Sequence, residues 1–168
     1  GNDPALRQET AVAHFKSAVI AARLGAVNDA IKEYESSQHA FEELVHAEPT
    51  HVEPRAQLAL SHNNLGLLFA ARSEADRARK EYLKAIEIQK RLVQEHTDDP
   101  FVAGQLAESE ANLGLLLDQA GESKGAEQSL RAAIQVLRPP ADANSNQPKL
   151  SRDLAIACNN LSFVLRTR

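Results

Sequence analysis

Histidine and cysteine are the side chains of this chain best suited to bind a metal or act as a nucleophile. The chain has six histidines and a single cysteine, Cys158. A zinc site on a helix needs two histidines one turn apart with an acidic residue beside them. No pair has that pattern, and His46 and His51 lie on opposite sides of an expected turn. We therefore expect no metal or other cofactor, and histidines that are hydrated or hydrogen-bonded.

Catalytic groups are equally hard to assemble from the sequence. Cys158 lies among apolar residues at helical spacing, where a cysteine is usually a small packing residue. Nucleophilic catalysis would require a histidine with a second polar residue beside it, and nothing nominates such a pair. There is no glycine-rich phosphate loop and no nucleophile elbow. The carboxylates occupy positions typical of solvated helix faces: Glu33, Glu35, Glu42, Glu43, Glu81 and Glu87. The sequence therefore predicts a stretch without enzymatic activity.

Asparagine is the polar residue that recurs most regularly. The segment 62–68, HNNLGLL, returns as EANLGLL at 110–116 and as CNNLSFV at 158–164, each copy 48 residues after the last. A fixed period of this size is typical of a repeat array. Amide side chains both donate and accept hydrogen bonds. Asn64, Asn112 and Asn160 therefore allow two interpretations, a peptide-binding strip or hydrogen bonds within the array.

The same period holds at other positions and defines the expected elements. Gly25, Ser73 and Gly121 are 48 apart; so are Ala30, Ala78 and Ala126, and Tyr34, Tyr82 and Leu130. Apolar residues recur between these markers at helical spacing. We predict three helix pairs, at residues 4–49, 50–99 and 100–148, followed by a lone helix at 149–168. Together they form seven antiparallel helices in a single domain, 1–168.

Proline, serine and aspartate mark the expected helix ends. Asp3-Pro4 and Asp99-Pro100 each combine a capping side chain with proline at the first helical position. Pro49 ends the helix before it near residues 47–48. Ser73, with Asp76 three residues later, predicts a capping box. Pro139-Pro140 should end a helix early and leave a loop at 139–148.

Small and large residues alternate at the expected helix contacts. Gly66 and Gly114, with Ala18 and Ser162 at the same repeat position, allow two helices to cross closely. Glycine costs roughly 1 kcal/mol relative to alanine inside a helix, so a close approach must offset that loss. The expected neighbours include Leu65, Leu113 and Leu161, with Tyr34, Tyr82 and Leu130.

Composition narrows the partners. The chain has 19 Lys+Arg and 23 Asp+Glu, a formal net charge of −4, whereas nucleic-acid binding relies on excess positive charge. No apolar run approaches the ~20 residues that cross a bilayer. We therefore expect neither a nucleic-acid partner nor a membrane partner. We also expect a cytoplasmic location, because a single cysteine forms no intramolecular disulfide and suits a reducing compartment. The initial glycine and the absence of methionine suggest a piece of a longer protein.

These motifs resemble the tetratricopeptide repeat. Leu65-Gly66, Phe69, Ala78, Tyr82 and Ala85 follow its Leu-Gly, aromatic, Ala, aromatic, Ala pattern, and Leu113-Gly114, Leu117, Ala126, Leu130 and Ala133 follow it again. His62, Glu110 and Cys158 stand at the family's tryptophan position. The common repeat has about 34 residues, so these units resemble a long-helix variant. Similar arrays occur in large bacterial multidomain proteins, some of them after serine/threonine kinase modules.

The resemblance implies an all-α, right-handed superhelix whose first helices line a concave groove for a peptide or partner helix. The groove residues carried over are Phe15, Val19, Arg23, Asn63, Asn64, Leu67, Asn112, Leu115, Gln119, Asn159, Asn160 and Phe163, with Val12, Ala22, Leu60, Ala71, Glu108, Ala111 and Ile156 beside them. The family's clamp for a C-terminal carboxylate is not expected, because Leu60, Asn63, Glu108 and Ala111 replace its basic residues.

Three functional hypotheses follow. The first is a non-catalytic scaffold that binds a protein or peptide of unknown identity. The second is a ligand-sensing domain that regulates an attached kinase or other effector. The third is a homodimer formed through the last helix, which we expect to expose Leu161, Val164 and Leu165, because terminal repeats need a polar outer face to stay unpaired.

Overall fold

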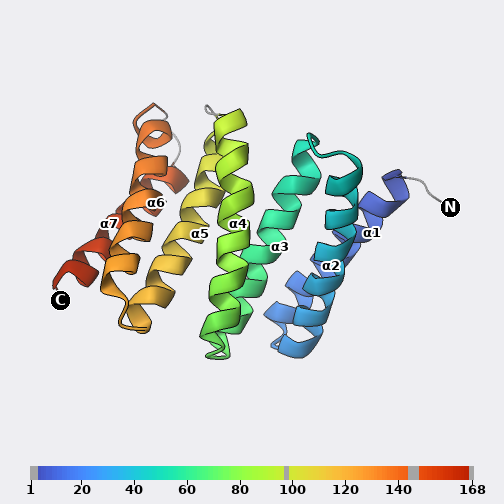
Figure 1. The fold of residues 1–168 in the computed structure, drawn as a ribbon, viewed down its shortest axis with the longest axis horizontal. Coiled ribbons are helices and arrows are strands. Elements are labelled where there is room, and N and C mark those ends of the chain that lie inside the picture. The colour runs from blue at the N-terminus through green and yellow to red at the C-terminus, as the bar shows by residue number, and fades with distance from the viewer. Residues whose placement is uncertain (1–3, 97–98, 144–147, 167–168) are drawn as a thin grey trace. The chain divides into compact units, whose positions relative to one another are not determined.

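The structure, a computed structural model, describes residues 4–96, 99–143 and 148–166. These residues form seven helices and no strand, which confirms the predicted all-α class (Figure 1). Among them, none combines the length and apolar character that crossing a membrane requires. The helices are α1 (Pro4–Arg23), α2 (Val27–Ala47), α3 (Val52–Ala71), α4 (Ala75–Glu95), α5 (Pro100–Gln119), α6 (Ser123–Ala143) and α7 (Pro148–Arg166).

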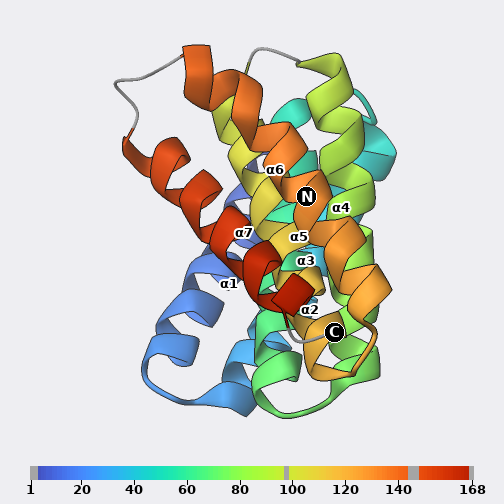
Figure 2. The same ribbon diagram turned by 90° about the vertical axis from the view of Figure 1, so that its left-hand side faces the viewer.

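The chain divides into two compact units, Gly1–Ile88 and Gln89–Arg168, and the division falls within α4. In unit 1 the core gathers around Ala11, Phe41, Leu44 and Leu58. In unit 2 it gathers around Ala107, Ala133, Leu137, Leu150 and Ala157. There α7 packs mainly on α6 and also touches α5 (Figure 2). Each unit therefore has its own apolar core.

The close helix contacts predicted from glycine are present in both units. A Cβ added to Gly66 of α3 would lie 2.6 Å from Cε1 of Tyr82, and one added to Gly114 of α5 would lie 2.8 Å from Cγ of Leu130. Tyr82 and Leu130 occupy the same repeat position and are almost fully buried. The glycines therefore create the space that these two side chains fill.

The turn between the paired helices is also repeated, but Ser73 does not have its predicted role. Gly25 and Gly121 have φ of +77°, and Ser73 has φ of +61°. Its N–H donates to the carbonyl of Ala70 at 2.9 Å, and the next N–H, of Glu74, donates to Phe69. Ser73 thus closes α3 in a left-handed conformation. The predicted capping box is wrong, because the backbone geometry here is that of a helix end.

The other predicted helix boundaries have mixed outcomes. Asp99 caps α5 as predicted: its carboxylate accepts from the N–H of Phe101 at 2.8 Å, and Pro100 is the first helical residue. The prediction that Pro139-Pro140 end α6 is wrong, because the helix continues to Ala143. Proline's fixed φ is compatible with a helix, and α6 continues past both prolines without the hydrogen bonds that their missing N–H groups would donate. Asp3 lies outside the described residues.

Two buried glutamines are features that the sequence did not reveal. Gln89 is fully buried and Gln105 is 6% exposed, and their side-chain amides have no hydrogen-bond partner among the described residues. Gln89 stands at the repeat position that Phe41 and Leu137 fill in the other helix pairs. A polar residue therefore occupies a core position in the second pair.

Candidate functional site

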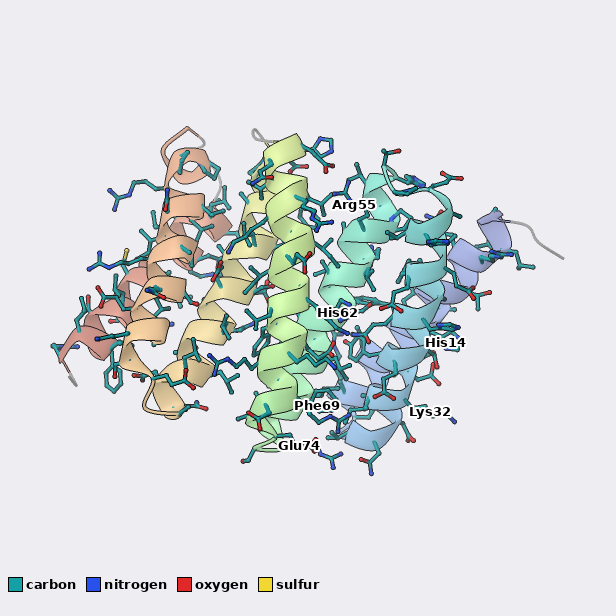
Figure 3. All side chains as sticks on the ribbon, in the orientation of Figure 1. His14, Lys32, Arg55, His62, Phe69 and Glu74 are labelled. Carbon is teal, nitrogen blue, oxygen red and sulfur yellow. The ribbon has the colours of Figure 1, made fainter. Side chains whose placement is uncertain are left out.

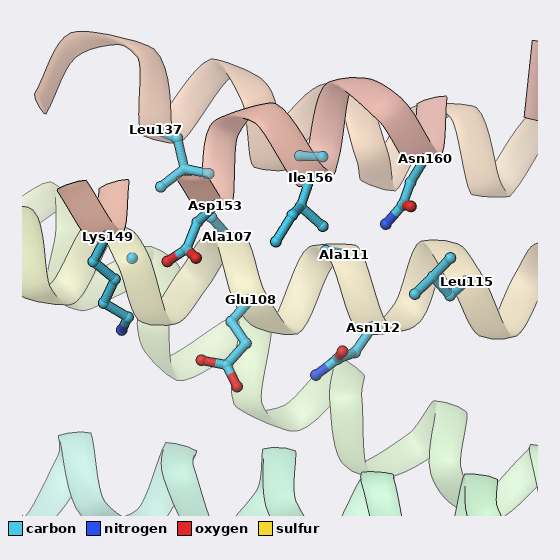
Figure 4. Close-up of a pocket in the computed structure, with 12 residues that line it drawn as sticks. Ala107, Glu108, Ala111, Asn112, Leu115, Leu137, Lys149, Asp153, Ile156 and Asn160 are labelled. Atoms are coloured by element: carbon cyan, nitrogen blue, oxygen red, sulfur yellow. The ribbon is translucent and has the colours of Figure 1, made fainter. Parts of the chain in front are cut away.

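One candidate site is a cavity of about 310 Å³ in unit 2, between α5 and α7 (Figure 4). Leu137 of α6 contributes to its lining. The α5 residues are Gly104, Ala107, Glu108, Ala111, Asn112 and Leu115, and the α7 residues are Lys149, Asp153, Ile156, Ala157 and Asn160. Both helices are first helices of their repeats, so the cavity lies on the face where the groove is predicted.

The lining of the cavity changes from charged side chains at one end, through apolar side chains, to amide side chains at the other end. Figure 4 shows Lys149, Asp153 and Glu108 toward one end, and the amides of Asn112 and Asn160 toward the other. Alanines and Ile156 line the section between them. Such a site offers an apolar anchor point flanked by hydrogen-bonding and charged groups, which is how proteins orient a bound ligand.

The structure brings together only some of the predicted groove residues of unit 2. Asn112, Leu115 and Asn160 line the cavity, as do their predicted neighbours Glu108, Ala111 and Ile156. Gln119, Asn159 and Phe163 are exposed but lie outside it. Sequence reasoning missed Lys149 and Asp153. Their spacing gave a signal, because residues 149, 153, 156 and 160 fall on one helical face.

In unit 1 the predicted asparagines serve the fold. Asn63 is predicted to lie on the groove surface, but it is only 2% exposed and therefore does not line an accessible groove. The amide of Asn64 donates to the Tyr34 hydroxyl at 3.1 Å. Phe15 meets the Tyr34 ring edge-on, with centroids 5.7 Å apart. Burial raises the pKa of Tyr34, outweighing the opposing effects of the Asn64 hydrogen bond and the Arg23 charge. For Asn64 the structure therefore shows a bond within the array.

The remaining predicted residues of unit 1 stay at the surface. Leu67 is 41% exposed, Arg23 is exposed and Val19 is half-buried. Two cavities in this unit are lined by other residues, one by Ala5, Leu44 and Pro54 among others and one by Gln38, Phe69 and Glu81 among others.

A buried polar cluster surrounds His62 of α3. Nδ1 of His62 is 2.6 Å from Oε2 of Glu81, and the amide of Gln38 donates to the same oxygen at 3.1 Å. Burial alone would raise the pKa of Glu81, but the hydrogen bond and charge of His62, with Lys84 and Gln38, hold that pKa below its ordinary value. His14 and Glu33, one repeat earlier, form the same pair at 2.7 Å. Figure 3 labels both histidines.

This pairing changes in the later repeats. Glu110 takes the histidine position in α5, and its carboxylate is 2.8 Å from Nζ of Lys90. Cys158 takes it in α7 and is exposed. Within the described residues, no group of three or more His, Cys, Asp or Glu side chains is arranged to hold a metal ion. The histidines are therefore hydrogen-bonded structural residues in the two repeats where they pair with glutamate.

Comparison with known proteins supports the fold. No protein-family model and no curated protein matches the chain. Among solved structures, the apo form of RapI matches 95% of this chain with a TM-score of 0.70 and 19% identity. BtubC from P. vanneervenii matches 99% with a TM-score of 0.60 and 18% identity. The chain spans 49% of the RapI chain and 65% of the BtubC chain. At this identity the likeness shows a shared helical fold.

Proposed function

We propose that this chain is a non-catalytic interaction module of the tetratricopeptide type, which binds a peptide or partner helix against α5 and α7. The observation that supports this most directly is the cavity of about 310 Å³ on that face. Its apolar middle section fits one aliphatic side chain of a partner. The amide of Asn160 at one end is placed to pair with the partner's backbone.

The charged end of the cavity favours a particular kind of peptide. Glu108 and Asp153 supply two carboxylates to the lining, where Lys149 is the basic residue, and Asp153 is also 3.7 Å from Nε of Arg152 outside the lining. A peptide with a basic residue near its aliphatic anchor would therefore be attracted, whereas an acidic C-terminal peptide would be repelled. This preference agrees with the absence of the family's basic carboxylate clamp from the sequence.

Selection of peptides from a random display library on the full chain tests the proposal. We expect the selected peptides to lose affinity about five- to tenfold when Ile156→Ala removes apolar contact or Asn160→Ala removes a hydrogen bond. Asn159→Ala is the matched control, because Asn159 is exposed on the same helix but outside the cavity. Selected peptides that bind all three variants as tightly as the parent would contradict this site.

A second candidate function is the sensing of a small molecule, with regulation of an attached effector such as a serine/threonine kinase. The cavity volume favours it as an alternative, because small-molecule sites have volumes from about 300 Å³ upward. A thermal-shift screen with a metabolite panel separates the two functions. A metabolite that raises the melting temperature of the parent but not of Ile156→Ala, together with a failed peptide selection, would support the sensor.

A further inference from the structure

Gly104 of α5 is a glycine that the packing of its helix does not require. Among the described residues, a Cβ added there would meet one side chain within 4 Å, that of Leu150, at 3.8 Å. At Gly66, Gly114 and Gly125 the added Cβ would lie 2.6, 2.8 and 3.1 Å from a neighbouring side chain. Glycine inside a helix is less stable than alanine, and at Gly104 no close contact offsets that loss.

The repeat does not require a glycine at this position either. At intervals of 48 residues, the same position holds Gln8 in α1, Ala56 in α3 and Arg152 in α7. Ala107, which lines the same cavity, differs in this respect, because its position holds alanine in every repeat. The alanine therefore belongs to the repeat, whereas the glycine is particular to α5.

The surroundings of Gly104 are apolar on the inside and charged at the edge. Gly104 is buried and lines the cavity between α5 and α7. Leu137, which also lines the cavity, is 1% exposed, and Leu150 is 4% exposed. Glu108 is exposed and follows Gly104 by one helical turn, so both lie on the same face of α5. This end of the cavity therefore combines apolar walls with a carboxylate at its edge.

The charged groups at this end favour a positively charged ligand. Figure 4 shows Glu108, Asp153 and Lys149 toward the same end. Among the described residues, Glu108 has no ion pair with Lys149 or with any other basic group. Asp153 is partly compensated by Arg152, whose Nε lies 3.7 Å from its carboxylate. Two carboxylates in the lining, one of them unpaired, attract a cation more than Lys149 repels it.

A lysine side chain has the chemistry that this end of the cavity accepts. Its methylene stem packs against apolar surface while its ammonium group stays at the edge with water. We propose that Gly104 determines specificity in this cavity by making room for a lysine of the bound peptide, whose ammonium group pairs with Glu108. This inference rests on the proposed function for the peptide and adds the residue that the peptide must carry.

Three small probes of similar length test the site without a peptide. n-Butylammonium has the stem and charge of a lysine side chain, butan-1-ol is neutral and butanoate has the opposite charge. The backbone N–H resonances of residues 104 and 108 in NMR spectra of the full chain report binding. We expect n-butylammonium to bind with a dissociation constant on the order of 10 mM. It should bind about threefold more tightly than butan-1-ol, and butanoate should bind more weakly still.

Gly104→Ala and Asn159→Ala are a matched pair of variants. Each replaces a poor helix former with alanine, but only Gly104 lines the cavity. Both should raise the melting temperature, whereas only Gly104→Ala should weaken n-butylammonium binding, by about threefold. Gly104→Val should abolish it, and Glu108→Gln should make n-butylammonium and butan-1-ol bind equally. If Gly104→Val fails to fold, the pair of alanine variants still decides the matter.

Three results with the small probes would overturn the inference. The first is that n-butylammonium binds Gly104→Ala and Gly104→Val as tightly as the parent, so that room at this glycine is not used. The second is that butan-1-ol or butanoate binds as tightly as n-butylammonium. The third is that n-butylammonium causes no saturable change at about tenfold the expected dissociation constant.

Peptides selected on the full chain separate this inference from the proposed function. We expect them to share a lysine whose replacement by norleucine lowers affinity about threefold in the parent but not in Glu108→Gln. Peptides that depend on Ile156 but on neither a lysine nor Gly104 would leave the proposed function standing and overturn this inference. A failed selection, with n-butylammonium still bound beside Gly104, would overturn the peptide partner while supporting recognition of an aliphatic ammonium group.

Discussion

At Gly66, the lack of room for a Cβ affects stability more than the low helix propensity of glycine does. Gly104, which has room for a Cβ, is the control. A Cβ at Gly66 would lie 2.6 Å from the buried Tyr82 ring, whereas one at Gly104 would meet its nearest neighbour, Leu150, at 3.8 Å. We predict that Gly66→Ala lowers the free energy of unfolding by about 1–3 kcal/mol through overpacking. Gly104→Ala should raise it by up to about 1 kcal/mol. Urea denaturation measures both, and changes of the same sign would refute the packing argument.

The buried pair of His62 and Glu81 makes the free energy of unfolding depend on pH in the acidic range. The folded chain holds the pKa of Glu81 below its ordinary value of 4.5, so near that pH the unfolded chain binds more protons. The stabilisation is therefore complete above that value and is lost as pH falls through the lowered pKa of the folded state. We predict that Glu81→Gln reduces stability at pH 7 by about 1–3 kcal/mol and flattens its decline below pH 4.5.

The pair of His14 and Glu33 is the matched control for this pH dependence. It occupies the same repeat positions, but its side chains are 38% and 31% exposed, against 3% and 11% for His62 and Glu81. Water screens an exposed pair, so Glu33→Gln should cost less than about 1 kcal/mol. Denaturation curves at several pH values compare the two. An equal loss in both variants would mean that burial is not the cause.

These two pairs also show where reading the sequence fell short at the residue scale. The period of 48 placed Gly66 opposite its large neighbour, because small and large residues are visible in the alignment of repeats. The histidine pairs join residues 19 apart on two successive helices, and this contact depends on how the turn sets their rotation. Burial of Asn63 depends on the same rotation of the helices about their axes, and the spacing of residues along the sequence does not specify that rotation.

At the scale of the element, the turn before α4 is strained where its counterparts are not. Ser73 has φ of +61°, at the position that Gly25 and Gly121 occupy in the other turns. A residue with a Cβ loses about 1 kcal/mol in this conformation. We predict that Ser73→Gly raises the free energy of unfolding by about 0.5–1 kcal/mol. Gly121→Ser should lower it by a similar amount, and thermal melts of the two variants check the symmetry.

Helix ends were predictable where a side chain does the capping and unpredictable where the backbone decides. Asp99-Pro100 begins α5 as expected because a carboxylate reaches the free N–H groups. Ser73 was misassigned because serine suits both a cap and a turn. Pro139-Pro140 predict a helix end, yet α6 continues to Ala143. The loss of two hydrogen bonds near a helix end is small enough for the helix to continue.

At the scale of the whole molecule, the helical class and the seven helices followed from periodicity, whereas only part of the site did. The register indicated which helices face a groove, and Asn112 and Asn160 do line one cavity. Sequence alone did not distinguish unit 2, which has this cavity, from unit 1, where Asn64 bonds Tyr34. A hydrogen bond between two helices, such as the one from Asn64 to the Tyr34 hydroxyl, is not visible in the spacing of residues along the chain.

Two compact units with separate cores predict that damage to one core stays local. Phe41 and Leu137 occupy the same repeat position, two repeats apart, and are 0% and 1% exposed. Replacing either with alanine should cost about 2–5 kcal/mol of local stability, and repeat proteins can open by segments. We predict that Leu137→Ala accelerates amide hydrogen exchange in α6 and α7 while α1 and α2 keep their protection, and that Phe41→Ala does the reverse. Uniform acceleration along the chain in both variants would show instead that the two cores unfold as one cooperative unit.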